Sequence, residues 1–282
     1  MAVIALMMTI SASAQFYIYC SDGNVIKVDS ISMVAPSYDE TPGIGTFSVS
    51  ADKQVTFSKG NLQYTQSTDT WSFADNQYDY LGEANIAIDA DVLADKVDLF
   101  GWSTSATNFG VSTSEDNNDY SGSFVDWGTN QIGSDAPNTW RTLSYDEWYY
   151  LRYNRTNADN LVGVAQVNGV NGLILLPDNW TCPAGVTFKS GFHSSYGVDY
   201  YAAYQTFTAA EWSKLEAAGA VFLPASGYRG GPDVNEVQYC SIYWSATEHN
   251  VGAYCLYFYS DEAYMHYGFR CTGWSVRLVK DL

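Results

Sequence analysis

Short alternating segments dominate the pattern of hydrophobic and polar positions along the chain. Residues 16–20 alternate between apolar and tyrosine side chains, and residues 25–28 regain the same strand character after a Ser-Asp-Gly-Asn turn at 21–24. A second pair of short segments, 47–49 and 55–57, surrounds an Ala-Asp-Lys turn. Each pattern predicts a β-hairpin.

Two later segments carry the same start signal for a helix, a Ser or Thr cap answered by a Glu three positions on. In both, an apolar residue before the cap can pack on a Trp one turn into the helix. The two sets are Leu143, Ser144, Glu147 and Trp148, and Phe207, Thr208, Glu211 and Trp212. Leu151 and Leu215 continue the apolar faces, and Gly219 is expected to end the second helix.

Strand-like segments surround the two predicted helices. They occur at 62–64, 71–73, 99–102, 221–224, 242–245, 254–260 and 274–279. The stretch 103–138 is rich in Ser, Thr, Asn, Gly and Asp and is expected to form long surface loops. Few β-α-β units are visible, so the pattern predicts an α+β fold with antiparallel pairing, two helices first and strands after them.

The N-terminal region predicts export. Residues 1–14 form a short apolar run that ends in an Ala-x-Ala site, typical of a secretory signal peptide, the alternative being a buried strand or helix. Residues 15–34 make the hairpin segment, 35–45 a linker with two prolines, and 46–282 the main domain. No later run reaches the roughly 20 apolar residues of a membrane span. We therefore expect a secreted, periplasmic or cell-surface protein.

The net charge and the cysteine spacing disfavour several kinds of partner and site. The formal net charge of −18 should repel nucleic-acid phosphates and anionic lipids. Five cysteines at wide spacing make neither a disulfide framework nor a zinc knuckle, although Cys255 and Cys271 could meet across a hairpin.

Four motifs, at 140–148, 222–229, 243–247 and 273–279, resemble one protein group. They are similar to C-type-lectin-fold proteins of the formylglycine-generating-enzyme-like (sulfatase-modifying-factor-like) group, and more narrowly to variable proteins of Bacteroidetes diversity-generating retroelements. The resemblance covers about residues 47–282. It implies a C-type lectin fold, in which two helices flank small twisted antiparallel sheets with long loops. It also implies that ligand binding, and any diversified positions, lie near the C-terminus.

Alternation in the last forty residues separates core from surface. Tyr254, Leu256 and Phe258 form the better core set, and the side chains between them should face outward. The expected framework is Tyr243, Trp244, Arg270, Gly273, Val276, Leu278 and Arg277, the last as a buried partner for an acid. The expected ligand contacts are Cys255, Tyr257, Tyr259, Asp261, Glu262, Tyr264, His266, Tyr267, Phe269, Cys271, Thr272 and Trp274. The alternative is that these aromatic rings fill a local core.

Catalytic and metal chemistry find little support in the sequence. The enzyme branch of the resembled group uses two closely spaced cysteines to bind copper, whereas Cys240 and Cys271 lie fifteen or more positions from Cys255. The three histidines lack metal-ligand spacing. The loop at 115–119 concentrates oxygen ligands, so Asp116 and Asp119 are weak calcium candidates against the alternative of a solvated acidic loop.

The sequence therefore predicts an exported, non-catalytic protein that binds an unidentified protein or glycan ligand through an aromatic-rich C-terminal surface of the kind that retroelements diversify. It predicts no required cofactor, no nucleic-acid partner and no membrane span. Two alternatives are a formylglycine-generating-enzyme-like oxidase and a structural surface or fimbria-associated subunit that uses the N-terminal hairpin for assembly.

Overall fold

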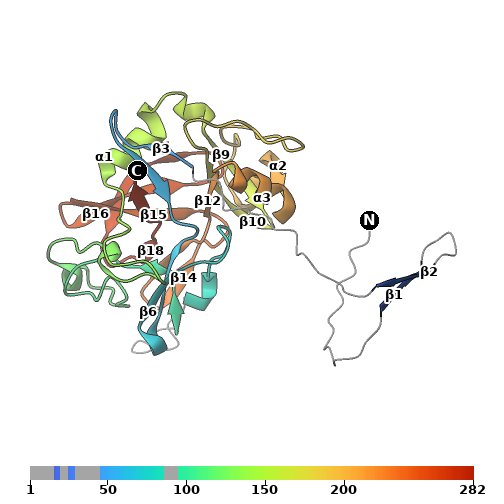
Figure 1. The fold of residues 1–282 in the computed structure, drawn as a ribbon. Coiled ribbons are helices and arrows are strands. Elements are labelled where there is room, and N and C mark those ends of the chain that lie inside the picture. The colour runs from blue at the N-terminus through green and yellow to red at the C-terminus, as the bar shows by residue number, and fades with distance from the viewer. Residues whose placement is uncertain (1–15, 20–24, 29–44, 86–94) are drawn as a thin grey trace. The chain divides into compact units, whose positions relative to one another are not determined.

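The computed structural model describes residues 16–19, 25–28, 45–85 and 95–282. Internal contacts divide the chain into two units, residues 1–40 and 41–282 (Figure 1). The predicted signal peptide (1–14) and all but the last residue of the predicted linker (35–45) lie outside the described residues.

The first unit contains the predicted N-terminal hairpin. Strands β1 (Phe16–Tyr19) and β2 (Val25–Val28) pair antiparallel, with Phe16 opposite Val28 and Tyr19 opposite Val25. The hairpin is therefore confirmed.

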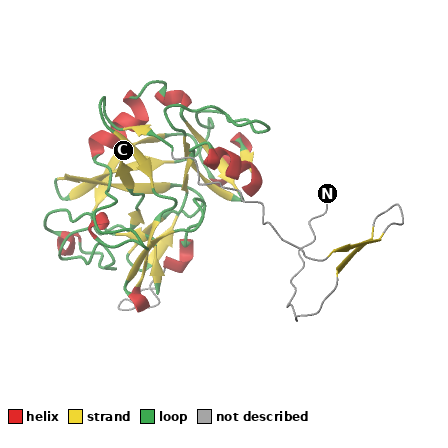
Figure 2. Ribbon diagram, viewed as in Figure 1, coloured by secondary structure: helices red, strands yellow, loops and turns green. Residues whose placement is uncertain are grey.

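The second unit is a mixed α/β structure of small sheets with few helices (Figure 2). Its helices are α1 (Tyr145–Tyr149), which continues as a π-helical turn (Tyr150–Asn154), α2 (Val198–Tyr204) and α3 (Ala209–Ala217). Short 3₁₀ turns occupy Gln66–Thr68, Gly82–Asn85, Asn117–Tyr120, Trp127–Thr129 and Ala158–Asn160. None of the helices found in the described residues has the length and apolar character needed to cross a membrane.

Five sheets make up the second unit within the described residues. A four-stranded sheet has the order β11 (Thr206–Phe207), β9 (Val162–Val167), β10 (Val170–Leu175), β12 (Val221–Pro224). A five-stranded sheet has the order β17 (Ala263–Phe269), β16 (Gly252–Phe258), β15 (Ser241–His249), β18 (Trp274–Ser275), β8 (Leu99–Phe100). One three-stranded sheet has the order β19 (Val279–Asp281), β4 (Gln54–Phe57), β3 (Phe47–Ser48). Another has the order β6 (Thr70–Phe73), β5 (Leu62–Thr65), β7 (Lys96–Val97). The last sheet is the pair β13 (Tyr228–Gly230) and β14 (Asp233–Asn235). Pairing is antiparallel except between β11 and β9 and between β15 and β18.

Both predicted helix starts are confirmed. The Ser144 Oγ accepts a hydrogen bond from the Glu147 backbone N–H at 3.2 Å, and the Glu147 carboxylate accepts one from the Ser144 N–H at 2.9 Å. Thr208 and Glu211 form the same reciprocal pair. Helix α2 was not predicted, because its N-cap is a glycine that offers no side-chain cap. The predicted order of helices before strands is also incomplete, since strands precede α1 and separate α1 from α2.

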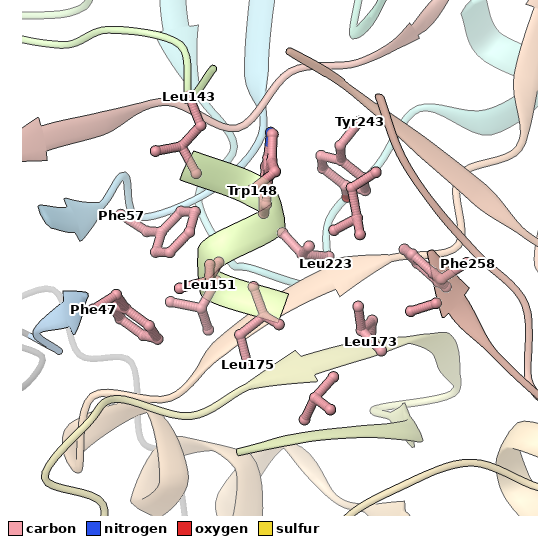
Figure 3. Close-up of a cluster of buried hydrophobic side chains, with 14 of the residues drawn as sticks. Phe47, Phe57, Leu143, Trp148, Leu151, Leu173, Leu175, Leu223, Tyr243 and Phe258 are labelled. Atoms are coloured by element: carbon pink, nitrogen blue, oxygen red, sulfur yellow. The ribbon is translucent and has the colours of Figure 1, made fainter. Parts of the chain in front are cut away.

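Helix α1 packs into the first of three hydrophobic cores. Figure 3 shows Trp148 on α1 and Leu151 in the π-helical turn that follows it, beside Phe57 and Leu223. The second core contains Trp102, Trp127, Trp244 and Trp274, and the third lies between α3 and the four-stranded sheet. Strand β16 separates the first two cores.

Most of the expected framework residues are buried as predicted. Tyr243, Trp244, Val276 and Leu278 are each at most 1 % exposed. Arg277 is buried too, but it donates to the side-chain oxygens of Gln77 and Asn61, at 2.5 and 3.3 Å, so the expectation of an acidic partner is wrong. Burial lowers the pKa of Arg277 to about 10.

The suggested Cys255–Cys271 contact is also wrong. Both thiols are free, and Cys255 lies opposite His266 in the pairing of β16 with β17. Cys271 lies beyond the end of β17 and is partly exposed, whereas Cys255 is buried in the middle of the sheet.

A buried carboxyl group, that of Asp98, lies between β7 and β8. Asp98 is fully buried and accepts hydrogen bonds from the Asn85 side-chain amide at 2.7 Å and the Leu81 backbone N–H at 2.9 Å. Burial outweighs these bonds and raises the pKa of Asp98 from 3.8 to about 6.

Asp98 should make stability depend on pH. Because its pKa is higher in the folded than in the unfolded chain, the folded state binds the proton more tightly, and stability should fall as pH rises from about 4 to about 6, by roughly 2–3 kcal/mol. Urea unfolding across this range, compared between the wild type and Asp98→Asn, measures the effect. The variant cannot ionise at this position and should lack that part of the slope; equal slopes in both proteins would contradict the assignment.

Candidate functional site

The C-terminal ribbon of β15, β16 and β17 carries most of the predicted contact residues, and β17 forms the edge of its sheet. Residues paired across neighbouring strands share a face. Tyr257 pairs with Tyr264, and Cys255 with His266, whereas Tyr267 pairs with Tyr254 on the opposite face. The predicted contacts therefore lie on both faces of the ribbon, and the expectation that they share the face opposite Leu256 is wrong for Tyr267 and Phe269.

Exposure sorts the predicted contact residues into three groups. Glu262, His266, Tyr267 and Phe269 are exposed, the Tyr267 and Phe269 side chains at 51 % and 62 %. Six are partly exposed: Tyr257, Tyr259, Asp261, Tyr264, Cys271 and Thr272. Cys255 and Trp274 are buried.

Cys255 and Trp274 are therefore not contact positions. Cys255 faces the second core, because β16 is buried on both sides, and burial raises the pKa of its thiol well above the usual value. Trp274 packs against Trp244 with the ring centroids 3.8 Å apart. Both residues belong to the framework.

A group of rings, which we call the ribbon cluster, gathers on one face of the ribbon and in the segments beside it. Its members are Tyr196, Tyr239, Tyr257, Tyr259, Tyr264 and His266. The rings of Tyr196, Tyr239 and Tyr259 meet nearly at right angles, with centroids 5.9 to 6.2 Å apart. Edge-to-face contact of this kind is favourable between aromatic rings, so the cluster holds its own arrangement.

The hydroxyl groups of Tyr257 and Tyr259 in the ribbon cluster stay protonated at neutral pH. Tyr257 and Tyr259 share a hydrogen bond between their hydroxyls. Burial is the first cause that raises the pKa of both, that of Tyr259 to about 12. Burial also lowers the pKa of His266. The cluster therefore offers neutral hydrogen-bonding tips on large apolar rings.

A second group, the helix cluster, runs from α1 onto the other face of the ribbon. Its members are Tyr145, Tyr149, Tyr153, His249, Tyr254 and Tyr267. The shortest ring contacts are those of Tyr145 with Tyr254, at 4.3 Å, and His249 with Tyr267, at 3.9 Å. The rings of His266 and Tyr267 stack at 5.4 Å and so join the two clusters around the edge strand. We call both clusters together, with Phe269, the aromatic surface.

Arg270 anchors the backbone beneath the aromatic surface, as the framework prediction expected. Its buried guanidinium lies over the Trp102 ring and donates to the carbonyl oxygens of Gly252 and Gly122, each at 3.1 Å, and of Asn250 at 3.3 Å. These bonds tie the β15–β16 turn to a distant loop. The exposed rings therefore stand on a frame that is held by other groups.

Gly273 is the second framework position beside this surface. A Cβ at this residue would lie 2.8 Å from the Cβ of Arg229, too close for any other residue without a shift of the backbone.

The carboxylates of the acidic loop at 115–119 accept hydrogen bonds from residues close to them in the sequence. Asp116 accepts a hydrogen bond from the Asn118 N–H at 2.9 Å, and Asp119 accepts one from the Ser114 hydroxyl at 2.6 Å. Across the described ranges, no three His, Cys, Asp or Glu side chains come together as a metal site would require.

A separate cleft of about 710 Å³ lies beside β4, β6 and β19. The Phe73 and Trp140 rings meet edge to face in its wall, and three lysines, Lys59, Lys96 and Lys280, line it. None of the predicted contact residues lines this cleft.

Several rings of the aromatic surface were missed at the sequence level. Tyr145, Tyr149 and Tyr153 recur every four residues, a spacing that places them on one side of a helix and could have indicated them. Tyr196 lies in an irregular segment and Tyr239 in a turn, and neither segment carries such a signal. Tyr254 was assigned to the core but lies partly exposed against Tyr145.

The exposure pattern predicts how truncation affects stability. The triple variant His266→Ala, Tyr267→Ala, Phe269→Ala should shift the Tm by less than about 4 °C, because these side chains are exposed. Trp274→Ala should cost about 3–5 kcal/mol, because it leaves a cavity beside Trp244. Differential scanning calorimetry measures both, and a collapse of the triple variant would mean that its rings belong to the core.

Comparison of the chain with protein-family models, with curated proteins and with solved structures finds no match.

Proposed function

We propose that this chain is an exported, non-catalytic binding protein that recognises its ligand with the aromatic surface. The observation that carries the proposal is the exposure of large rings: Tyr196, Tyr267 and Phe269 are 51–62 % exposed on a domain whose other large apolar side chains are mostly buried. Contiguous exposed apolar patches are typical of binding sites in soluble proteins.

Tyrosine suits this role physically. Its ring offers a large contact area and its hydroxyl a hydrogen bond, while its few rotamers keep the entropy lost on binding small. The ring contacts described above restrict the free rings further, which lowers that entropy loss again. The surface is therefore organised before a ligand arrives.

The scaffold in this proposal is a C-type lectin fold of the resembled group. Supporting it, the four motif segments supply buried framework residues such as Leu143, Phe222, Trp244 and Val276. The mixture of Tyr, His and Phe that resembles retroelement-diversified positions lies on β16 and β17 instead. This division between fixed frame and variable surface is what a diversified binding protein requires.

Thiol chemistry of the oxidase kind is disfavoured by the cysteine environments. Cys240 and Cys255 are both buried, and burial is the first cause that raises the pKa of each thiol. Protonated, enclosed thiols are poor nucleophiles and poor metal ligands. Export rests on the apolar run at 1–14 and is part of the same proposal.

A ligand search with a matched control tests the proposal. The full chain is used to select from a phage-displayed random peptide library and to probe a glycan array, in parallel with the triple alanine variant of His266, Tyr267 and Phe269. A control variant, Lys59→Ala, Asp75→Ala, Lys280→Ala, alters the cleft instead. We expect ligands that bind the wild type and the control but lose at least about tenfold in affinity on the ring variant.

Ligands that bind all three proteins equally, or no ligand at all from either collection, would overturn the proposed function.

A further inference from the structure

We infer that the aromatic surface takes a basic protein segment, whose Lys or Arg side chains lie over tyrosine rings and pair with the carboxylates around them. This inference rests on the proposed function and names the chemical class of its ligand. Three features of the surface support this inference. They are its exposed carboxylates, the bonds that already occupy its arginines, and the rings that have no cation over them.

Carboxylates border both clusters. Glu262 is exposed and Asp261 partly exposed in the turn between β16 and β17, and the Glu248 side chain is 69 % exposed beside His249. The charges of Glu262 and Asp261 act on the rings: after burial, both are among the causes that raise the pKa of Tyr264, and Glu262 also raises that of Tyr153. The turn between β16 and β17 therefore places two negative charges beside the rings.

The cations beside this surface are already engaged. Arg152 is 12 % exposed and donates to the Ala263 carbonyl oxygen at 3.1 Å and to Asp159 at 3.2 Å. Arg270 is 8 % exposed; it donates to the carbonyl oxygens beneath the ribbon and is ion-paired with Glu248 at 3.3 Å. Within the described residues neither arginine forms an ion pair with Asp261 or Glu262, so the negative charge of these two carboxylates is left for a partner.

The exposed rings can each accept a cation over one face, in a cation–π contact. The Arg152 guanidinium already lies over the Tyr153 ring, 4.7 Å from its centroid. Among the described residues, no other ring of the aromatic surface has a Lys or Arg of the chain over it. A ligand cation can therefore repeat with the exposed Tyr267 or Tyr196 the contact that Arg152 makes with Tyr153.

Charge decides between ligand classes. An acidic segment would be repelled both by these carboxylates and by the net charge of −18. A neutral glycan would gain from the rings, but its affinity would depend little on ionic strength. A basic segment gains from rings and carboxylates together, and electrostatic attraction would also speed its association.

The experiment extends the library selection. Peptides that depend on the rings are sequenced, and their affinities are measured by calorimetry with the wild type and with the double variant Asp261→Asn, Glu262→Gln. The matched control, Asp52→Asn, Glu83→Gln, changes the net charge equally at exposed positions elsewhere. We expect enrichment of Lys and Arg, about a tenfold loss of affinity in the double variant but not in the control, and weaker binding as salt rises.

Ring-dependent ligands that are neutral or acidic, or whose affinity is the same in the double variant and the control, would overturn this inference and leave the proposed function standing. Failure to recover any ring-dependent ligand would instead overturn the proposed function.

Discussion

Burial of β16 on both faces is the constraint on which the rest of the C-terminal structure depends. Leu256 and Phe258 fill one core while Ala253 and Cys255 fill another, so the strand is fixed between them. Its neighbour β17 has a partner on one side only and lies at the sheet edge. Side chains on β17 therefore pass from buried Ala263 to exposed Phe269 within a single strand.

The sequence predicted those features correctly that depend on interactions between residues close together in the chain. The capping boxes of Ser144 and Thr208 involve residues three positions apart, and the structure shows both. Simple alternation failed in β16, because a strand between two cores hides both of its faces, as Cys255 shows. The face taken by Tyr267 depends on its pairing with Tyr254, and such a register cannot be derived from either segment alone.

The aromatic surface differs from a core although both consist of rings. In the core, the indole N–H groups of Trp102 and Trp244 donate to backbone carbonyl oxygens, which satisfies them internally. On the surface, the Tyr267 ring contacts that of His249, and both Tyr267 and Phe269 are more than half exposed. A domain can lose rings of the second kind without losing its fold, and this separates recognition from stability.

The bonds of Arg270 bear on how this surface can change over generations. Its guanidinium is held mainly by main-chain oxygens, those of Gly252, Gly122 and Asn250, and every amino acid supplies such an oxygen. The hold on the turn is therefore largely indifferent to which side chains stand around it. A lineage can exchange the neighbouring side chains one after another while this single arginine keeps the same backbone in place.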